Sequence, residues 1–158
     1  MRYQKPERIT ISKAGVFYGG KAIPLGDLKY VYISGANSVS EYGDNLGCYS
    51  VTLRNSHDSY LLLETQDKGE AKKMLKDIKR VLGNRRGIKL YNNSAIVNLE
   101  HLVDVKVSKP GQENSNKVKL YMDNGRVLRV FRSAFEMPAR IYASTIKADI
   151  NNYSKPSM

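Results

Sequence analysis

The sequence contains two copies of one pattern, which meet at a polar, basic stretch at residues 84–87 (Asn-Arg-Arg-Gly). In the first copy, residues 22–28 lead into an apolar run at 31–34. In the second copy, residues 95–102 lead into a similar run at 105–108, and each copy continues into a hairpin and a helix. A repeat constrains the fold strongly, because each copy is expected to build the same supersecondary unit. The sequence therefore predicts two units, residues 1–83 and 84–158.

The apolar positions of the two expected helices correspond with one constant offset along the chain. Apolar residues three and four apart form one buried face of a helix. The helix expected over residues 69–82 ends at Gly83, and the second is expected over 136–151, before a disordered tail at about 152–158. We predict an α+β fold of two tandem ββββα repeats, packed as one pseudo-symmetric domain. The matching helix positions are Ala71, Met74, Leu75, Ile78 and Leu82 in the first copy, and Ala139, Tyr142, Ala143, Ile146 and Ile150 in the second.

The charge balance is the strongest indication of function. The formal net charge is +11, and the first 83 residues hold 13 basic and 9 acidic side chains against 13 and 6 in the remainder. The positive charge is therefore spread over both predicted units. Such a field favours polyanions, with nucleic acid first and an anionic membrane surface second. The alternative is that the charge only keeps the protein soluble.

Several other classes of protein fit the sequence poorly. No apolar run approaches the roughly 20 residues of a membrane span, and the first residues lack the apolar core of a signal peptide. The single cysteine, Cys48, has no partner for an internal disulfide, which is typical of a reducing compartment. We therefore expect an intracellular protein, either cytoplasmic or associated with the nucleoid.

No group of residues in the sequence has the spacing of a catalytic or metal site. The two histidines, His57 and His101, are isolated, and Cys48 has no motif for nucleophilic catalysis. The Gly-Gly-Lys at residues 19–21 lacks the remaining elements of a phosphate-binding loop and is interpreted as a turn. We predict that the protein is not an enzyme and has no metal or cofactor.

Alternation along the expected strands predicts one apolar face and one face that carries tyrosines and cations. Cations bind phosphates and release counterions, and exposed bases stack on aromatic rings without needing a particular sequence. This combination favours single-stranded nucleic acid, RNA ahead of DNA, bound largely without sequence preference. Tyrosine and lysine are also ordinary on the wet face of a sheet, which is the structural alternative. The predicted binding residues are Tyr30, Tyr32, Arg54, Lys89, Tyr91, Lys106, Lys117, Lys119, Tyr121 and Arg129.

The layout resembles that of the whirly and PUR-type nucleic-acid-binding proteins. The resemblance rests on two basic strand-and-helix units in tandem over residues 8–151, with aromatics on the sheets, and on no sequence motif. It implies binding of single-stranded DNA or RNA on antiparallel sheets, and a homo-oligomer formed through the helices. No individual binding residue is taken from this family.

A second resemblance concerns the opening of the chain. Residues 9–16 (Ile-Thr-Ile-Ser-Lys-Ala-Gly-Val), followed by Ala-Ile-Pro-Leu-Gly-Asp-Leu at 22–28, are similar to the start of bacterial PH-like domains. This resemblance implies a module that binds a protein or a lipid headgroup, acting as an adaptor or inhibitor. The second copy has too few expected strands for such a barrel, which favours the first resemblance.

Overall fold

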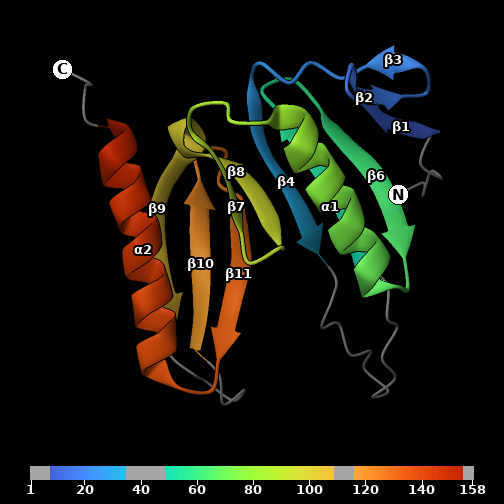
Figure 1. Cartoon of the computed structure of the whole chain (residues 1–158). Coiled ribbons are helices and arrows are strands. Elements are labelled where there is room, and N and C mark those ends of the chain that lie inside the picture. Colours follow the sequence, from blue (N-terminus) through green and yellow to red (C-terminus); the bar gives the residue numbers. More distant parts are fainter. Residues whose placement is uncertain (1–7, 35–48, 109–115, 155–158) are drawn as a thin grey trace. The chain divides into compact units, whose positions relative to one another are not determined.

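The computed structural model describes residues 8–34, 49–108 and 116–154, and the fold is given for these residues (Figure 1). Over these residues the protein is α+β, with antiparallel sheets and two α-helices. It divides into two compact units, residues 1–85 and 86–158. Cys48 and residues 155–158 of the predicted tail lie outside the described residues. Neither α-helix among the described residues combines the length and hydropathy that a membrane crossing requires.

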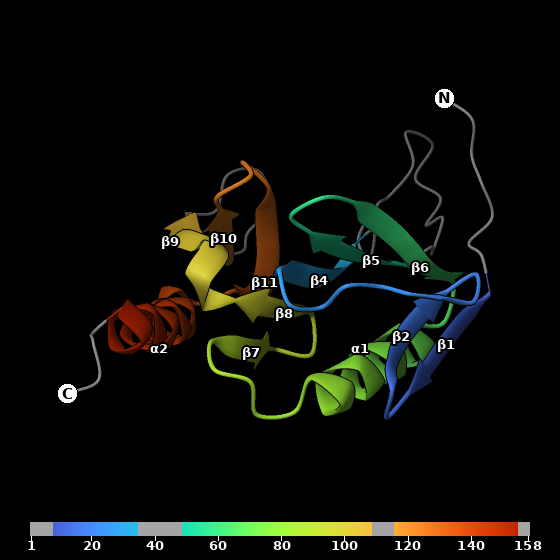
Figure 2. The same ribbon diagram turned by 90° about the horizontal axis from the view of Figure 1, so that it is seen from above.

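In the first unit, a small three-stranded sheet precedes an antiparallel meander and a helix. Strand β2 pairs with β1 and with β3, and β5 lies between β4 and β6. The helix α1 packs against β4, β5 and β6 and also contacts β1 and β2 (Figures 1 and 2). The elements are β1 (Ile9–Ser12), β2 (Gly15–Tyr18), β3 (Lys21–Ala22), β4 (Leu28–Ser34), β5 (Tyr49–Asn55), β6 (Ser59–Thr65) and α1 (Lys68–Leu82).

Both ends of α1 follow from its sequence. The Asp67 carboxylate accepts a hydrogen bond from the Gly69 N–H at 2.9 Å, which caps the first turn. Glu70, three residues after Asp67, accepts a hydrogen bond from the Thr65 hydroxyl at 3.0 Å. The helix ends at Gly83, whose φ of 61° lies in the region that favours glycine.

In the second unit, a hairpin leads through a short 3-10 helix into a three-stranded antiparallel sheet and a helix. The central strand of that sheet is β10, between β9 and β11. The helix α2 packs along all three of these strands (Figure 1). The elements are β7 (Ile88–Tyr91), β8 (Ala95–Asn98), η1 (Leu99–His101), β9 (Leu102–Ser108), β10 (Asn116–Met122), β11 (Val127–Ser133) and α2 (Glu136–Ser154).

The helix positions that correspond in sequence are buried alike. Ala71, Leu75 and Ile78 are buried in α1, and their counterparts Ala139, Ala143 and Ile146 are buried in α2. Among the described residues the first unit has six strands and the second five, compared with four in a strict ββββα repeat. Each unit consists of a three-stranded meander and a helix, preceded by β1, β2 and β3 in the first unit and by the pair β7–β8 in the second.

The end of α2 also differs from the prediction. The helix continues to Ser154, through residues expected to be disordered, because Tyr153 has partners within the unit. The Arg86 guanidinium lies 5.3 Å from the centre of the Tyr153 ring, an arrangement typical of a cation–π contact. Gly87 has a φ of +84°, and a Cβ at this position would lie 2.7 Å from the Tyr153 ring. Glycine at position 87 therefore allows the last turn of α2 to pack.

Candidate functional site

Five cations lie on one face of the sheet formed by β9, β10 and β11. Lys119 of β10 lies directly opposite both Lys106 of β9 and Arg129 of β11, so three cations form a row across the sheet. Residues that face each other on neighbouring strands have Cβ atoms roughly 4.5–5.5 Å apart. Lys117 of β10 lies opposite Arg132 of β11 in the next row. We call this surface the basic face, and its members are Lys106, Lys117, Lys119, Tyr121, Arg129 and Arg132.

The opposite face of the same sheet is apolar and is packed against α2. Val105, Val118, Leu120 and Leu128 are all fully buried, and α2 contacts all three strands. Because side chains alternate between the two faces of a strand, burying these residues fixes their charged neighbours on the other face. The alternating pattern of β10, Lys-Val-Lys-Leu-Tyr-Met over residues 117–122, therefore determines the basic face.

Sequence reasoning missed one member of the basic face, Arg132. Simple alternation from Arg129 would place Phe131, and not Arg132, on the same face. The register between β10 and β11 instead shifts between Val118 and Lys119, as it does at a β-bulge. Phe131 consequently turns toward α2 and stacks on Tyr142, with ring centres 4.8 Å apart. No signal in the sequence marks this bulge.

Tyr121 is the aromatic residue of the basic face. The Lys106 ammonium lies 5.3 Å from the centre of its ring, within the range of a cation–π contact. Asp104 of β9 lies opposite Tyr121 in register. One oxygen of the Asp104 carboxylate accepts a hydrogen bond from the Val105 N–H at 2.8 Å. The face thus offers an aromatic ring, a cation and a hydrogen-bond acceptor close together.

Tyr30 and Tyr32 do not present their rings to solvent, contrary to the prediction. Their exposed fractions are 6% and 9%, and the neighbouring residues Val31 and Ile33 are buried as well. Both faces of β4 are therefore covered, so alternation in this strand does not separate a wet face from a core face. A tyrosine ring is apolar enough to serve as a core residue. Arg54, which lies opposite Tyr30 on β5, is half-buried.

Lys89 and Tyr91 belong to the β7–β8 hairpin and not to the sheet of the basic face. Lys89 is exposed, but Tyr91 is buried and its ring packs edge-on against Tyr142. The Tyr91 hydroxyl donates a hydrogen bond to the Asp149 carboxylate at 2.8 Å. Burial, and then the bond to Asp149, raises the pKa of Tyr91 far above its ordinary value. The prediction that Tyr91 is available to stack on a base is therefore wrong.

Both histidines are paired with carboxylates. His101 Nδ1 lies 2.6 Å from Asp123 Oδ2, and His57 Nε2 lies 3.4 Å from Asp27 Oδ2. Within residues 8–34, 49–108 and 116–154, no three His, Cys, Asp or Glu side chains come together as metal ligands would. Cys48 lies outside these ranges.

Comparison with known proteins gives no family for this chain. No protein-family model matches it, and no curated protein matches it. Among solved structures, it is similar to a LytTr DNA-binding domain from Bacillus cereus, with a TM-score of 0.42 and 14% identity over 93% of this chain and 98% of that one. A likeness this weak carries no argument about function. None of these comparisons supports the resemblance to whirly, PUR-type or PH-like proteins.

Proposed function

We propose that this protein binds single-stranded nucleic acid on the basic face of its second unit and is not an enzyme. The observation that carries the proposal is the row formed by Lys106, Lys119 and Arg129 across three adjacent strands. Like charges that face each other across a sheet destabilise it. A polyanion laid along the row removes this repulsion and releases its own counterions.

The shape and chemistry of the face favour a single strand. Duplex readers usually insert a helix or a ribbon into a groove, whereas these cations belong to the surface of a three-stranded sheet. The ring of Tyr121, beside the cations, supports stacking of an unpaired base. Because the other predicted tyrosines are buried, phosphate contacts supply most of the affinity. Binding is consequently insensitive to sequence.

RNA is favoured over DNA by Asp104, which lies opposite Tyr121. An ionised carboxylate only accepts hydrogen bonds, and one of its oxygens already accepts from the Val105 N–H. The remaining lone pairs suit the 2′-hydroxyl of a ribose, which is the group that distinguishes RNA from DNA. DNA has no donor to offer at this position.

We also propose that the protein forms a homo-oligomer through the beginning of α2. Phe135, Met137 and Ile141 are 74%, 66% and 58% exposed, which is unusual for large apolar side chains so close together. The exposed positions of α1 carry Lys73, Lys76 and Arg80 instead. Sedimentation equilibrium tests this proposal, since Ile141→Lys should shift the protein toward the monomer and a monomeric wild type would contradict it.

Fluorescence anisotropy with labelled single-stranded oligonucleotides tests the binding proposal. The affinity should fall steeply with salt concentration, and Lys117→Glu with Lys119→Glu should weaken binding without unfolding the protein. The control is Lys73→Glu with Lys76→Glu on α1, which changes the net charge equally and should leave binding close to that of the wild type. No binding by the wild type at 50–100 mM salt, where phosphate contacts still act, would reject the proposal.

The alternative function is a PH-like protein-interaction module, an adaptor or inhibitor. The exposed apolar residues at the start of α2 favour it, because contiguous apolar surface marks interfaces as well as oligomers. The two functions differ in their response to nuclease. This alternative would be supported by a partner protein that the immobilised wild type retains after nuclease treatment and that the immobilised Ile141→Lys variant does not retain.

A further inference from the structure

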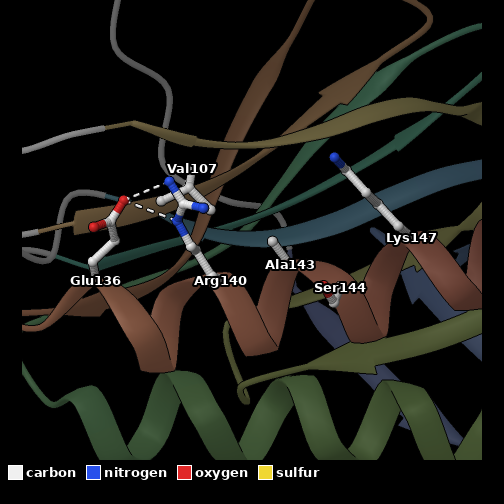
Figure 3. A pocket seen from close by; sticks show the side chains of 6 residues that line it. All are labelled: Val107, Glu136, Arg140, Ala143, Ser144 and Lys147. Atoms are coloured by element: carbon white, nitrogen blue, oxygen red, sulfur yellow. Dashed lines mark hydrogen bonds and ion pairs between the residues drawn. The ribbon is translucent and has the colours of Figure 1, made fainter.

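A groove of about 300 Å³ runs between strand β9 and helix α2 (Figure 3). Val107 of β9 forms one side, and the other side is formed by residues of α2. Strand β9 is an outer strand of its three-stranded sheet, so the groove lies at an edge of that sheet. The α2 residues that line the groove are Glu136, Arg140, Ala143, Ser144 and Lys147.

One residue that lines the groove is small in α2 and large at the corresponding position of α1. Ala143 corresponds to Leu75 under the offset that relates the two helices, and both are buried against their sheets. A leucine at position 143 would extend into the space that the groove occupies.

Two cations and a hydroxyl lie on the helix side of this groove. The Glu136 carboxylate accepts from Nε and Nη2 of Arg140 at 2.8 and 2.7 Å, which orients the guanidinium while other N–H groups remain available. Lys147, two turns farther along, is exposed and extends from the same face (Figure 3). Ser144 lies between them. This set of donors suits a phosphate group.

The groove and the basic face adjoin along strand β9. Lys106 belongs to the basic face, and Val107, the next residue, lines the groove. Successive side chains point to opposite faces of a β-strand. A nucleic acid strand that crosses the edge of the sheet here therefore passes directly from the basic face to the groove. Its phosphates would then meet Arg129, Lys119 and Lys106 on the sheet, and the cations of α2 beyond the edge.

An extended peptide paired with β9 is a poorer occupant of this groove. Addition of a strand needs unpaired backbone donors along the sheet edge. The Val105 N–H already donates a hydrogen bond to the Asp104 carboxylate at 2.8 Å. It is therefore not available to pair with an added strand. A phosphate diester requires only the side-chain donors of α2.

We infer that the groove binds a phosphate of the same nucleic acid strand that lies on the basic face, with Arg140, Ser144 and Lys147 as its donors. This inference rests on the proposed function and extends it. The strand wraps around the edge of β9, and the full site needs a longer oligonucleotide than the basic face alone.

The salt dependence of binding, measured with oligouridylates of graded length, tests this inference. Each phosphate contact to a single strand contributes about 0.7 to the slope of log affinity against log salt. Lys147→Gln should reduce the slope by about this amount for long oligomers and leave it unchanged for the shortest that bind. Ala143→Leu, which fills the groove without changing charge, should weaken binding of the long oligomers only.

Two controls separate the groove from the basic face. Lys119→Gln should reduce the slope at every length, since it acts on the basic face itself. Lys73→Gln on α1 has the same effect on net charge as Lys147→Gln and should leave the slope unchanged. If Lys147→Gln leaves the slope unchanged at all lengths while Lys119→Gln still lowers it, the inference that the groove binds a phosphate is overturned and the proposed function stays intact. Equal effects of Lys73→Gln and Lys147→Gln would overturn it too, and absence of wild-type binding would reject both proposals.

Discussion

Lys119 of β10 lies directly opposite Lys106 of β9, so two like charges face each other on adjacent strands. Favourable pairs at such positions stabilise a sheet by roughly 0.2–1 kcal/mol, whereas like charges directly opposite each other destabilise it. We therefore expect Lys119→Thr to raise the free energy of unfolding by about this amount at low salt, with a smaller gain at high salt because salt screens the repulsion. Urea unfolding at two salt concentrations measures both values.

The matched control for this prediction is Lys89→Thr. Lys89 is an exposed strand residue that lies opposite Val97, so the same substitution there removes no like-charge pair. Its effect on stability should be smaller and independent of salt. A loss of stability in Lys119→Thr at low salt would show that repulsion in the row is not a significant cost.

Tyr121 should contribute to affinity through its ring and not through its hydroxyl. Stacking of a base on an aromatic side chain contributes roughly 1–3 kcal/mol, although the base has to compete with the Lys106 ammonium for the ring. Tyr121→Ala should weaken binding of an oligonucleotide accordingly, and Tyr121→Phe should bind like the wild type. Anisotropy titrations at one salt concentration give both affinities. Equal affinities for Tyr121→Ala and the wild type would exclude stacking at this position.

Asp104 should determine the preference for RNA. A hydrogen bond to a charged acceptor contributes about 1.5–3 kcal/mol, so Asp104→Ala should lower the ratio of RNA to DNA affinity by about tenfold or more. Asp104→Asn keeps an oxygen for the Val105 N–H and should retain part of the preference. The measurement is competition between oligomers of equal length and matched sequence. A ratio unchanged in Asp104→Ala would remove the basis for this preference.

The buried Tyr91 hydroxyl should make stability depend on pH in the alkaline range. Its pKa in the folded protein is raised above the unfolded value of about 10, so the unfolded chain loses a proton that the folded protein keeps. The stabilisation is complete below about pH 10 and is lost as pH rises beyond it, by up to about 1.4 kcal/mol per pH unit. Tyr91→Phe should show a shallower decline, measured by urea unfolding from neutral to alkaline pH. Parallel declines in the two proteins would contradict this role of Tyr91.

The sequence indicated the helices and the alternation of β10 well, because both depend on local periodicity. The buried stripe of α1 and the faces of Lys117 and Lys119 follow directly from spacing. Lys106, Tyr121 and Arg129 join them because the hairpin and its flanking strand pair as neighbours. Half of the predicted binding residues therefore lie together on one face.

The remaining predicted residues depended on tertiary contacts that periodicity does not report. Tyr30 and Tyr32 alternate with apolar neighbours as exposed residues would, yet both faces of β4 are buried. Tyr91 is buried, and its hydroxyl donates a hydrogen bond to Asp149, which is far away in sequence. Arg132 reaches the basic face only through a bulge between the strands. Each difference arises from pairing between distant segments.

The most direct test of this account is the salt dependence of oligouridylate binding by a variant with the row removed. Lys106→Gln, Lys119→Gln and Arg129→Gln together should reduce the slope of log affinity against log salt by about 2, from about 0.7 per lost phosphate contact. Circular dichroism should show that the variant remains folded. A folded variant that binds with the wild-type slope would contradict the claim that this row of cations holds the nucleic acid.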